Sequence, residues 1–464
     1  MSTDTRKRQS RYTRRDFLEV VGATGLAMGL GMAWSPSAAR AAPVKPWSYI
    51  PKGAKPKKLV FTSWEWSNRY KRFLPRWEKD WGIPLVAELT PPGPTQFDRA
   101  YTLFAAGDQL DVITSLITDR AGFLGADMIR PIDDMPGVEE YVKDFHRFTK
   151  ECLVVDGKVW GLPYFVETWV PLYYEDLLHK AGFDKPFEDW DELIEQGLKA
   201  KMDKVSDYPL LWCAGVGTEQ LPGCWFGLTW SMGGVFFDKK GNHALGPGSV
   251  ARKALKWWQD TFLKTKISDP RSLELRFIPA VKAYMQGKFI YLLIQREYYL
   301  SFANDEAQSP IAGKVRAMGL PNNRIIGAGH GFVMCTATAN PEWAWKLLQL
   351  VGGKTKDGEY SFHNLDLELT MAGSGYKSVM TPENYLKRVG KWVPKGNEKE
   401  ILAGYENATG VLEVLPVMLE PWYRSWIDAL NVQVQKCLRG EISPDVACDN
   451  LIKEIGKAKK KAKV

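Results

Sequence analysis

Histidine and metal-type cysteine patterns are scarce in this sequence, which leaves little material for a metal or redox centre. The 464 residues contain only five His and six Cys, with no C-x-x-C pair and no cysteine run of iron–sulfur spacing. Cys213 and Cys224 are eleven residues apart, as are Cys437 and Cys448, so each pair permits a local disulfide without demanding one. We therefore expect no metal and no cofactor.

A large excess of charge of one sign is also lacking, which argues against a nucleic acid partner. Residues 1–41 hold seven of the 62 Lys and Arg and three of the 54 Asp and Glu, so the remainder has 55 basic and 51 acidic residues, a net charge of +4. Five lysines fall in the last eight residues, which leaves the folded body close to neutral, without a clustered basic surface. We expect residues 456–464 to be a solvated, frayed, Lys-rich tail with at most weak attraction to anionic lipid.

No apolar run suits a permanent membrane anchor, and the run near the N-terminus is typical of an export signal. Six basic residues precede the uncharged stretch 20–34, whose fifteen residues include four glycines and are too few to span about 30 Å of hydrocarbon. Ala39-Arg40-Ala41 offers a cleavage site. "TRRDFLEVV" resembles the twin-arginine signal, which exports folded proteins; the alternative is a disordered basic tail beside a short helix. We expect a signal peptide over 1–41, cleaved near Ala41, and a periplasmic mature protein.

Apolar periodicity predicts alternating strands and helices. A chain of 464 residues exceeds one ordinary core, so two or three lobes are expected. Helical spacing over 70–81, with a kink at Pro75 and an end at Gly82, lies between apolar runs typical of buried strands. The expected strands are 57–64, 83–89 and 110–117, and a second helix covers 97–108. This β-α-β-α-β order is typical of an open α/β sheet.

Turn and capping residues mark further elements. Asp156-Gly157 joins two apolar runs within 152–163 and supplies the positive φ angles of a type I′ hairpin turn. Helix starts are predicted where a capping residue precedes a first-turn acid or proline, at Asp189 with Glu192, Asn340-Pro341 and Ser443-Pro444.

One segment carries a specific family resemblance. Residues 156–195, "DGKVWGLPYFVETWVPLYYEDLLHKAGFDKPFEDWDELIE", contain a Gly-Lys hairpin, Gly-x-Pro, Tyr-Tyr-x-Asp-Leu-Leu, Ala-Gly and Trp-Asp-Glu-Leu in that order. This order resembles the family 1 extracellular solute-binding proteins of ABC importers, the maltose-binding-protein-like group. Weaker matches such as "MGGVFFDKKGN" and "LRGEISPDVACDNL" extend the resemblance over most of 57–455, whereas about 353–410 matches poorly.

The resemblance implies an α/β, two-lobed periplasmic-binding-protein fold (type II-like), with a ligand cleft between lobes that are joined by crossing strands. It places lobe 1 at 42–165 plus 317–355 and lobe 2 at 166–316 plus 356–455. It also implies a monomer, not an enzyme, that captures a carbohydrate by lobe closure and delivers it to ABC permease subunits in the membrane. Nineteen tryptophans, many near expected strand ends, favour a sugar, oligosaccharide or polyol.

Glu167 is the leading candidate for a ligand contact, because several relatives in the resembling family place a sugar-binding carboxylate at this point after Gly-x-Pro. A carboxylate accepts bidentate hydrogen bonds from neighbouring hydroxyls, and aromatic faces pack on pyranose rings. The alternative for Glu167 is a hinge salt bridge, and for Trp169, Tyr173 and Tyr174 it is core packing. We expect Glu167→Ala to weaken ligand binding by a few kcal/mol and to leave the fold intact.

Most other candidates lie at expected strand ends or in a Gly-rich stretch, where the loops of an α/β sheet reach a ligand, and Trp422 begins an expected helix near the C-terminus. The predicted ligand contacts are Trp64, Glu65, Trp66, Ser115, Glu167, Trp225, Trp230, Gln295, Arg296 and Trp422. A packed aromatic or a surface charge is the alternative for each. Arg296 leaves an anionic ligand such as a sugar phosphate open, and His330 in "GAGHGF" is expected to be structural or a loop contact.

Two other functions stay open. An exported glycoside hydrolase needs paired carboxylates about 5–9 Å apart, but the sequence has no nucleophile elbow, zinc helix or phosphate loop. A sensor subunit uses the same cleft with a different docking surface. Stoichiometric binding without turnover separates a binding protein from a hydrolase.

Overall fold

The computed structural model describes residues 45–65, 67–91, 94–116, 120–217, 220–324, 326–408, 415–418 and 420–462. The expected signal peptide at 1–41 and the candidate Trp66 lie outside the described residues. Backbone contacts group Lys45–Val464 as one unit. No helix in the described ranges combines the length and the apolar character that crossing a membrane requires.

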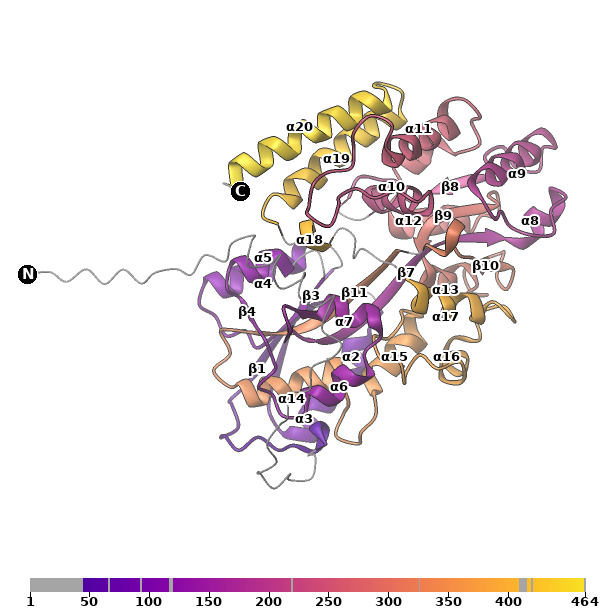
Figure 1. Cartoon of the computed structure of the whole chain (residues 1–464). Helices are drawn as coiled ribbons and strands as arrows, with labels where there is room; N and C mark the ends of the chain where they lie inside the picture. Colours follow the sequence, from indigo (N-terminus) through magenta and orange to yellow (C-terminus); the bar gives the residue numbers. More distant parts are fainter. Residues whose placement is uncertain are drawn as a thin grey trace, which may run out of the picture. The chain divides into compact units, whose positions relative to one another are not determined.

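A mixed sheet of nine strands runs through the described chain in the order β2-β1-β3-β11-β7-β9-β8, with β10 paired to β7 and β4 paired to β11 (Figure 1). Strands β1, β2 and β3 are parallel, as are β8 and β9, whereas β7 and β11 run antiparallel to their neighbours. The strands are β1 Leu59–Trp64, β2 Leu85–Thr90, β3 Val112–Ser115, β4 Ile129–Arg130, β5 Val154–Val155, β6 Lys158–Val159, β7 Leu162–Tyr174, β8 Leu210–Trp212, β9 Tyr291–Arg296, β10 Val315–Ala317 and β11 Ile326–Cys335.

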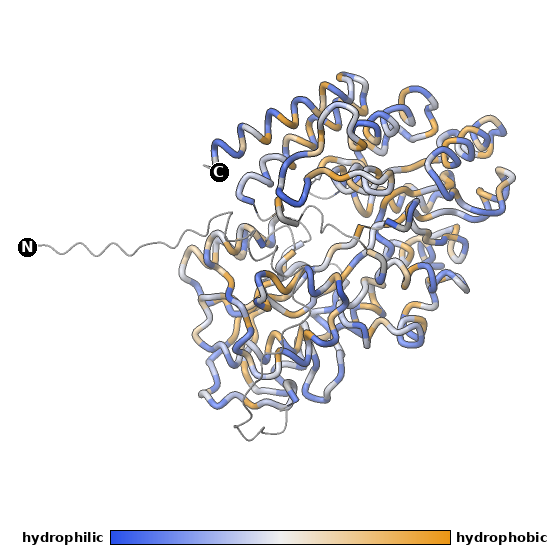
Figure 2. Tube along the Cα trace, in the orientation of Figure 1, coloured by the Kyte–Doolittle hydropathy of each residue, from blue (hydrophilic) through white to orange (hydrophobic). Residues whose placement is uncertain are grey.

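Helices pack around these strands. Helices α19 and α20 lie side by side and contact α11, and Figure 2 shows hydrophilic residues at the C-terminal end of the chain. The helices are α2 Arg69–Phe73, α3 Pro75–Trp81, α4 Pro94–Ala105, α5 Arg120–Gly125, α6 Val138–Asp144, α7 Arg147–Leu153, α8 Glu175–Lys180, α9 Trp190–Met202, α10 Gln220–Ser231, α11 Val250–Leu263, α12 Phe277–Tyr284, α13 Leu300–Ala303, α14 Pro341–Gly352, α15 Ser361–Thr370, α16 Pro382–Val389, α17 Glu398–Asn407, α18 Leu415–Met418, α19 Tyr423–Leu438 and α20 Pro444–Ala462, with 3₁₀ turns η1 Pro46–Ser48, η2 Pro270–Leu273, η3 Glu297–Tyr299 and η4 Pro321–Asn323.

The predicted β-α-β-α-β start is confirmed. All six residues of β1 are buried, as the apolar run predicts. The expected kink at Pro75 divides the first helix into α2 and α3, because proline lacks the N–H for helical bonding but suits a first helical position. Gly82 ends α3 with a φ of 63°, which glycine adopts without a Cβ clash.

Strand β7 connects the two parallel groups of strands. Its residues from Leu162 to Trp169 pair with β11, and those from Trp169 to Tyr173 pair with β9. The first eleven of its thirteen residues are buried, as expected for a strand covered on both faces. Strand β7 therefore connects the two groups in the way that the crossing strands implied by the family resemblance would.

Glycines allow helix α7 to lie close to β11. A Cβ on Gly331 would meet Leu153 at 2.6 Å, and one on Gly329 would meet Cys152 at 3.1 Å, so larger residues would push α7 away. The pairing of β11 with β7 shifts register between these two glycines, which places His330 at a bulge. The Gly-rich stretch "GAGHGF" thus has a packing role.

Capping and turn predictions hold at several places. Asp156 and Gly157 have φ angles of 53° and 72°, as the hairpin turn between β5 and β6 requires. The Asp189 side chain accepts hydrogen bonds from two backbone N–H groups in the first turn of α9. Ser443 accepts one from the start of α20 at 3.2 Å.

Two local expectations differ from the structure. Asn340 makes no side-chain capping bond, although Pro341 does begin α14. The Lys-rich end is helical rather than frayed, because α20 continues to Ala462 while its apolar side, including buried Ile455, packs against neighbouring helices. The cost of fixing that backbone is offset by burial, which composition alone does not reveal.

Residues 353–408 of the segment that resembles the family poorly pack against N-terminal helices and β7. Helix α15 contacts α2 and α14, and Gly373 bridges Val166 of β7. The predicted lobe boundaries at 165/166, 316/317 and 355/356 stay a prediction. These contacts join α15, expected in lobe 2, to elements expected in lobe 1.

All six cysteines are free and buried. The thiol of Cys224 lies 3.5 Å from the backbone oxygen of Cys213, and Cys437 and Cys448 lie on the packed pair α19 and α20. Burial raises the pKa of the Cys437 and Cys448 thiols to about 12, which disfavours the reactive thiolate. The structure therefore has neither of the two disulfides that the spacing permits.

Candidate functional site

One face of β7 presents Phe165, Glu167 and Trp169, because side chains two residues apart on a strand point the same way. The Phe165 ring lies 4.6 Å from the ring of His330 on β11. The Trp169 ring lies against Gly223 of α10, where a Cβ would come within 1.7 Å of Cζ3. The three β7 side chains are at most 6% exposed, so aromatic rings enclose a buried carboxylate.

Glu167 forms a buried ion pair with Arg296, the last residue of β9. Arg296 Nε donates to Glu167 Oε2 at 2.7 Å, and Trp169 Nε1 donates to Oε1 at 2.9 Å. Nε2 of His330 is 3.8 Å from Oε1. The Arg296 guanidinium also stacks on the rings of Trp169 at 4.8 Å and Phe277 at 4.2 Å. Glu167 thus makes the salt bridge that the sequence left as an alternative, and its contact with a ligand stays a prediction.

The surroundings of Glu167 favour its charged form. Burial raises the pKa of a carboxyl group, but the positive charge of Arg296, the nearby His330 and the hydrogen bond from the Trp169 indole outweigh burial and hold the pKa of Glu167 at about 2. The carboxylate and guanidinium charges then cancel, so the pair presents hydrogen-bonding groups with little net charge.

A bulge in β9 brings Arg296 opposite Trp169. The register between β7 and β9 shifts between Val170 and Leu172, and Ile294 adopts a φ of 49°. This left-handed backbone is unfavourable for a β-branched residue, so it persists only where the surrounding packing holds it. Bulges commonly re-aim a side chain beside a functional site, and this one directs Arg296 to Glu167.

A second carboxylate, Glu297, lies on the opposite side of β7. The Thr168 N–H and hydroxyl donate to Glu297 Oε2 at 2.6 and 3.1 Å, and the Tyr405 hydroxyl donates to Oε1. Burial and, to a smaller extent, the charge of nearby Glu167 raise the pKa of Glu297 to about 8. Glu297 therefore holds a proton near neutral pH, in contrast to Glu167.

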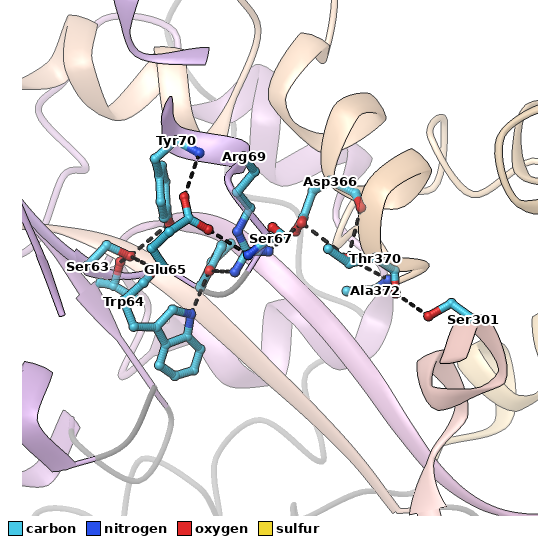
Figure 3. Close-up of polar contacts among 12 residues, drawn as sticks. Ser63, Trp64, Glu65, Ser67, Arg69, Tyr70, Ser301, Asp366, Thr370 and Ala372 are labelled. Atoms are coloured by element: carbon cyan, nitrogen blue, oxygen red, sulfur yellow. Dashed lines mark hydrogen bonds and ion pairs between the residues drawn. The ribbon is translucent and has the colours of Figure 1, made fainter. Parts of the chain in front are cut away.

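Trp64 and Glu65 follow one another at the end of β1 and have different roles (Figure 3). Trp64 is 9% exposed, and its indole Nε1 donates to the Tyr164 hydroxyl at 2.7 Å. The Glu65 carboxylate accepts the backbone N–H groups of Ser67 at 2.8 Å and Tyr70 at 3.0 Å, so it caps the start of α2. Of the two, only Trp64 carries an aromatic ring that a ligand could pack against.

A pocket of about 770 Å³ lies beside Glu65, between α2, α3 and the edge strand β2. Tyr70 and Leu74 line its helix side, and Leu89 and Thr90 line its strand side. Thr90 and Pro91 in its lining place one end of the pocket at the carboxyl end of β2, where open α/β sheets hold ligands. Its lining residues do not include the Glu167 cluster, so the pocket and the aromatic face of β7 are separate candidates.

The remaining polar candidates are held by local backbone. Ser115 ends β3, is buried, and donates from Oγ to the backbone oxygen of Leu116 at 3.1 Å. Gln295 precedes Arg296, and its side-chain oxygen accepts the Arg296 N–H at 3.0 Å. The structure thus brings Gln295, Arg296 and Glu167 together at the pairing of β7 and β9.

The three candidate tryptophans of α10 and the start of α19 occupy packed positions. Trp225 donates to the backbone oxygen of Ala251 at 2.9 Å and is fully buried. Trp230 is 4% exposed in the same helix, α10. Trp422 is 2% exposed, with its ring 5.8 Å from that of Phe237. This is the core packing that was the alternative for each of them.

Sequence reasoning missed Phe165, Tyr164 and Phe277 as neighbours of the candidate residues. Phe165 had a usable signal, because it lies two residues before Glu167 and so shares its face of β7. Phe277 had none, since its contact with Arg296 depends on how α12 packs. Among the described residues, no group of three or more His, Cys, Asp and Glu side chains is placed to hold a metal ion.

Comparison with known proteins agrees with this architecture. The model of the bacterial extracellular solute-binding protein family matches residues 65–355, more than half of the chain. A binding protein of Brucella abortus is 24% identical over 279 residues, which is 58% of this chain and 64% of that relative, so the match spans less than two thirds of its length.

Two solved structures share the fold over most of the chain. Maltose-bound MalE3 of T. maritima has a TM-score of 0.72 at 21% identity, covering 86% of this chain and 99% of its own. A ribitol complex of an ABC transporter solute-binding protein from Agrobacterium radiobacter has a TM-score of 0.70 at 18% identity, covering 86% and 98%. The predicted α/β, two-lobed class of periplasmic solute-binding proteins is confirmed. The chain belongs to the bacterial extracellular solute-binding protein family.

Proposed function

We propose that this protein binds an uncharged sugar, oligosaccharide or polyol outside the cytoplasmic membrane and delivers it to the permease of an ABC importer. The observation that carries the proposal is the buried Glu167–Arg296 pair within the aromatic face of β7, at the strands that join the two parallel groups. Family membership and the likeness to proteins solved with maltose and ribitol support the same ligand class.

The chemistry of this face suits a hydroxylated ring or chain. Carboxylate and guanidinium groups offer acceptors and donors to neighbouring hydroxyls, and the faces of Phe165 and Trp169 offer flat apolar surfaces. Lobe closure over such a ligand would add contacts from both sides of the strands. The Glu167 hydrogen bonds to Arg296 and Trp169 would then be shared with ligand hydroxyls.

Charge balance favours a neutral ligand over a sugar phosphate. Arg296 is the cation that left an anionic ligand open, and it is neutralised by Glu167 at 2.7 Å. A phosphate bound to Arg296 would meet the adjacent carboxylate, and like charges within a few ångströms repel strongly in a buried site.

The export route, the partner and the oligomeric state are part of the proposal. A twin-arginine signal over 1–41 with cleavage near Ala41 would place the mature protein in the periplasm. There, a monomer would dock its closed form on two permease subunits. The proposal includes no catalytic step.

Calorimetry of the purified protein with a panel of neutral sugars, polyols and sugar phosphates tests the function. We expect stoichiometric binding of at least one neutral member, with the ligand recovered unchanged. Thermal shifts give a second reading, because a ligand bound only by the folded state raises the melting temperature by mass action. Conversion of the ligand would instead support an exported hydrolase, and absence of binding across the neutral panel would contradict the proposal.

A pair of variants locates the site. Glu167→Gln removes the charge of the β7 carboxylate, and Leu89→Arg places a long cation in the pocket beside β2. We expect the first to weaken binding and the second to leave it unchanged. The opposite pattern would assign the ligand to the pocket.

A further inference from the structure

A buried polar chain links Trp64 on β1 to helix α15 (Figure 3). The Tyr164 hydroxyl oxygen accepts from the Trp64 indole at 2.7 Å and also from the Arg69 guanidinium. Arg69 in turn pairs with the Asp366 carboxylate. Tyr164 and Arg69 are 0% exposed and Asp366 is 2% exposed, so these three side chains are shielded from bulk water.

Each side chain in this hydrogen-bonded series is held in place by further contacts. Arg69 is the first residue of α2, whose backbone start is capped by Glu65, and its guanidinium lies 4.7 Å from the centre of the Tyr164 ring. Asp366 also accepts the Thr370 hydroxyl within α15 at 3.2 Å. Side chains with several fixed contacts lose their rotamer freedom, so the hydroxyl that receives the Trp64 indole has one position.

The location of Trp64 suggests why its indole ring is restrained. Trp64 is the last residue of β1, at the carboxyl edge where a parallel sheet meets its ligand. Its ring centre is 5.9 Å from that of Tyr164 and 6.3 Å from that of Phe165, so it extends the aromatic face of β7. An indole can turn about two side-chain bonds, and its only polar atom is Nε1. A hydrogen bond to that atom therefore fixes which face of the ring is presented.

We propose that Asp366, Arg69 and Tyr164 are positioning residues that hold the Trp64 indole in the orientation in which it packs on the ligand. This inference rests on the proposed function, and it gives α15, in the segment that resembles the family poorly, a role at the site. Asp366 acts through Arg69, Arg69 through Tyr164, and Tyr164 on Trp64. The residues that contact a ligand keep a defined geometry when supporting residues fix their rotamers, and the hydrogen-bonded side chains from Tyr164 to Asp366 supply that support.

Fluorine NMR of the full chain labelled with 5-fluorotryptophan tests the positioning without any ligand. Trp64→Phe identifies the Trp64 resonance among those of the nineteen tryptophans. We expect Tyr164→Phe, which removes only the hydroxyl, to shift and broaden that resonance. Asp366→Asn should do the same through Arg69. An unmoved Trp64 resonance in Tyr164→Phe would overturn the proposal.

A matched control separates positioning from stability. Asp449→Asn also removes a carboxylate from a nearly buried arginine, Arg252 on α11, but the elements involved are α11 and α20. We expect it to lower stability and to leave the Trp64 resonance unchanged. A shift of equal size in this control would mean that the resonance reports general loosening, and the proposal would fail.

Affinity for a neutral sugar or polyol that binds the wild type gives the functional reading. Loss of the indole hydrogen bond in Tyr164→Phe should raise the dissociation constant about tenfold. The double variant Trp64→Phe/Tyr164→Phe should bind no more weakly than Trp64→Phe, because the hydroxyl acts only through the indole. Additive losses would contradict the proposal. If the wild type binds no panel member, the proposed function fails, while the NMR result still decides whether Tyr164 positions Trp64.

Discussion

Replacing Glu167 with Ala should cost this protein much of its stability, in addition to any loss of ligand binding. The side chains of Glu167 and Arg296 are 1% and 5% exposed and are joined at 2.7 Å. Arg296 is also enclosed by the rings of Trp169 and Phe277, so its guanidinium stays buried once the Glu167 carboxylate is gone. The sequence-based expectation of an intact fold does not take this into account.

The magnitude follows from the burial of the pair. Removing one partner of a buried ion pair costs about 3–5 kcal/mol, because the remaining charge is left uncompensated. Typical domains unfold with about 5–15 kcal/mol, so Glu167→Ala should fold at 25 °C but with a markedly lower unfolding free energy. The Trp169 indole also loses its acceptor at 2.9 Å, which adds to the cost.

A double-mutant cycle measures this interaction. Unfolding free energies from denaturant titration are compared for the wild type, Glu167→Ala, Arg296→Ala and the double variant. We expect the double variant to be less destabilised than the sum of the single variants by about 1–3 kcal/mol. The reasoning is refuted if Glu167→Ala loses less than about 1 kcal/mol, or if the two changes are additive.

Acid provides an independent reading of the same pair. The pKa of Glu167 is about 2 in the folded chain against 4.5 for the unfolded group. Its contribution to the unfolding free energy is therefore complete above pH 4.5 and is lost as the pH falls from 4.5 toward 2. The wild type should lose stability over this range more steeply than Glu167→Ala does.

Glu297 should act in the opposite direction, because its pKa of about 8 in the folded chain is above the unfolded value of 4.5, so its stabilising contribution is lost as the pH rises. Between pH 6.5 and 8 the unfolding free energy should fall by roughly 1–2 kcal/mol. Glu297→Gln should remove this pH dependence in denaturant titrations. His363, with a pKa lowered to about 4 mainly by burial, acts below pH 6.5, so it does not contribute to that window. Gly223→Ala should lower stability by about 1–3 kcal/mol and change the near-UV circular dichroism, since the new Cβ displaces the Trp169 ring; a gain in stability, as expected for an unhindered helix position, would contradict the packing. Asp189→Ala should cost about 1 kcal/mol of unfolding free energy through loss of the α9 cap, and an unchanged midpoint would show that the cap contributes nothing.

Local signals in the sequence predicted much of the architecture. Pro75, Gly82 and the Asp156-Gly157 turn act on their own backbone, so their positions are fixed by neighbours in the chain. The alternation of strands and helices at the N-terminus was likewise predicted from apolar runs, whereas crossing strands were implied only by the family resemblance. Asn340 shows the limit of such signals, because a capping residue type does not guarantee that its side chain turns toward the helix.

The partners of the candidate residues could not be predicted in the same way. Glu167 and Arg296 are 129 residues apart, and their contact depends on a bulge at Ile294 that has no sequence signature. Arg69 and Asp366 are 297 residues apart, and Asp366 lies in the segment with little family resemblance. Composition does not distinguish a tryptophan at a ligand site from one in a core. Trp225 was therefore predicted to contact the ligand, and the structure places it in α10, fully buried.

Strand β7 runs from Leu162 to Tyr174, and its register shift against β11 lies between Pro163 and Val166, before Glu167 and Trp169. Successive side chains on one face of a strand are about 6.7 Å apart, so the side chains of residues 167 and 169, which follow the shift, have this regular spacing. A ligand lying along this part of β7 would meet side chains at that spacing, which the strand backbone sets. Binding a ligand of another length would then require changes in the loops. Substituting the residues on this face of β7 would instead change which chemical groups of the ligand are recognised.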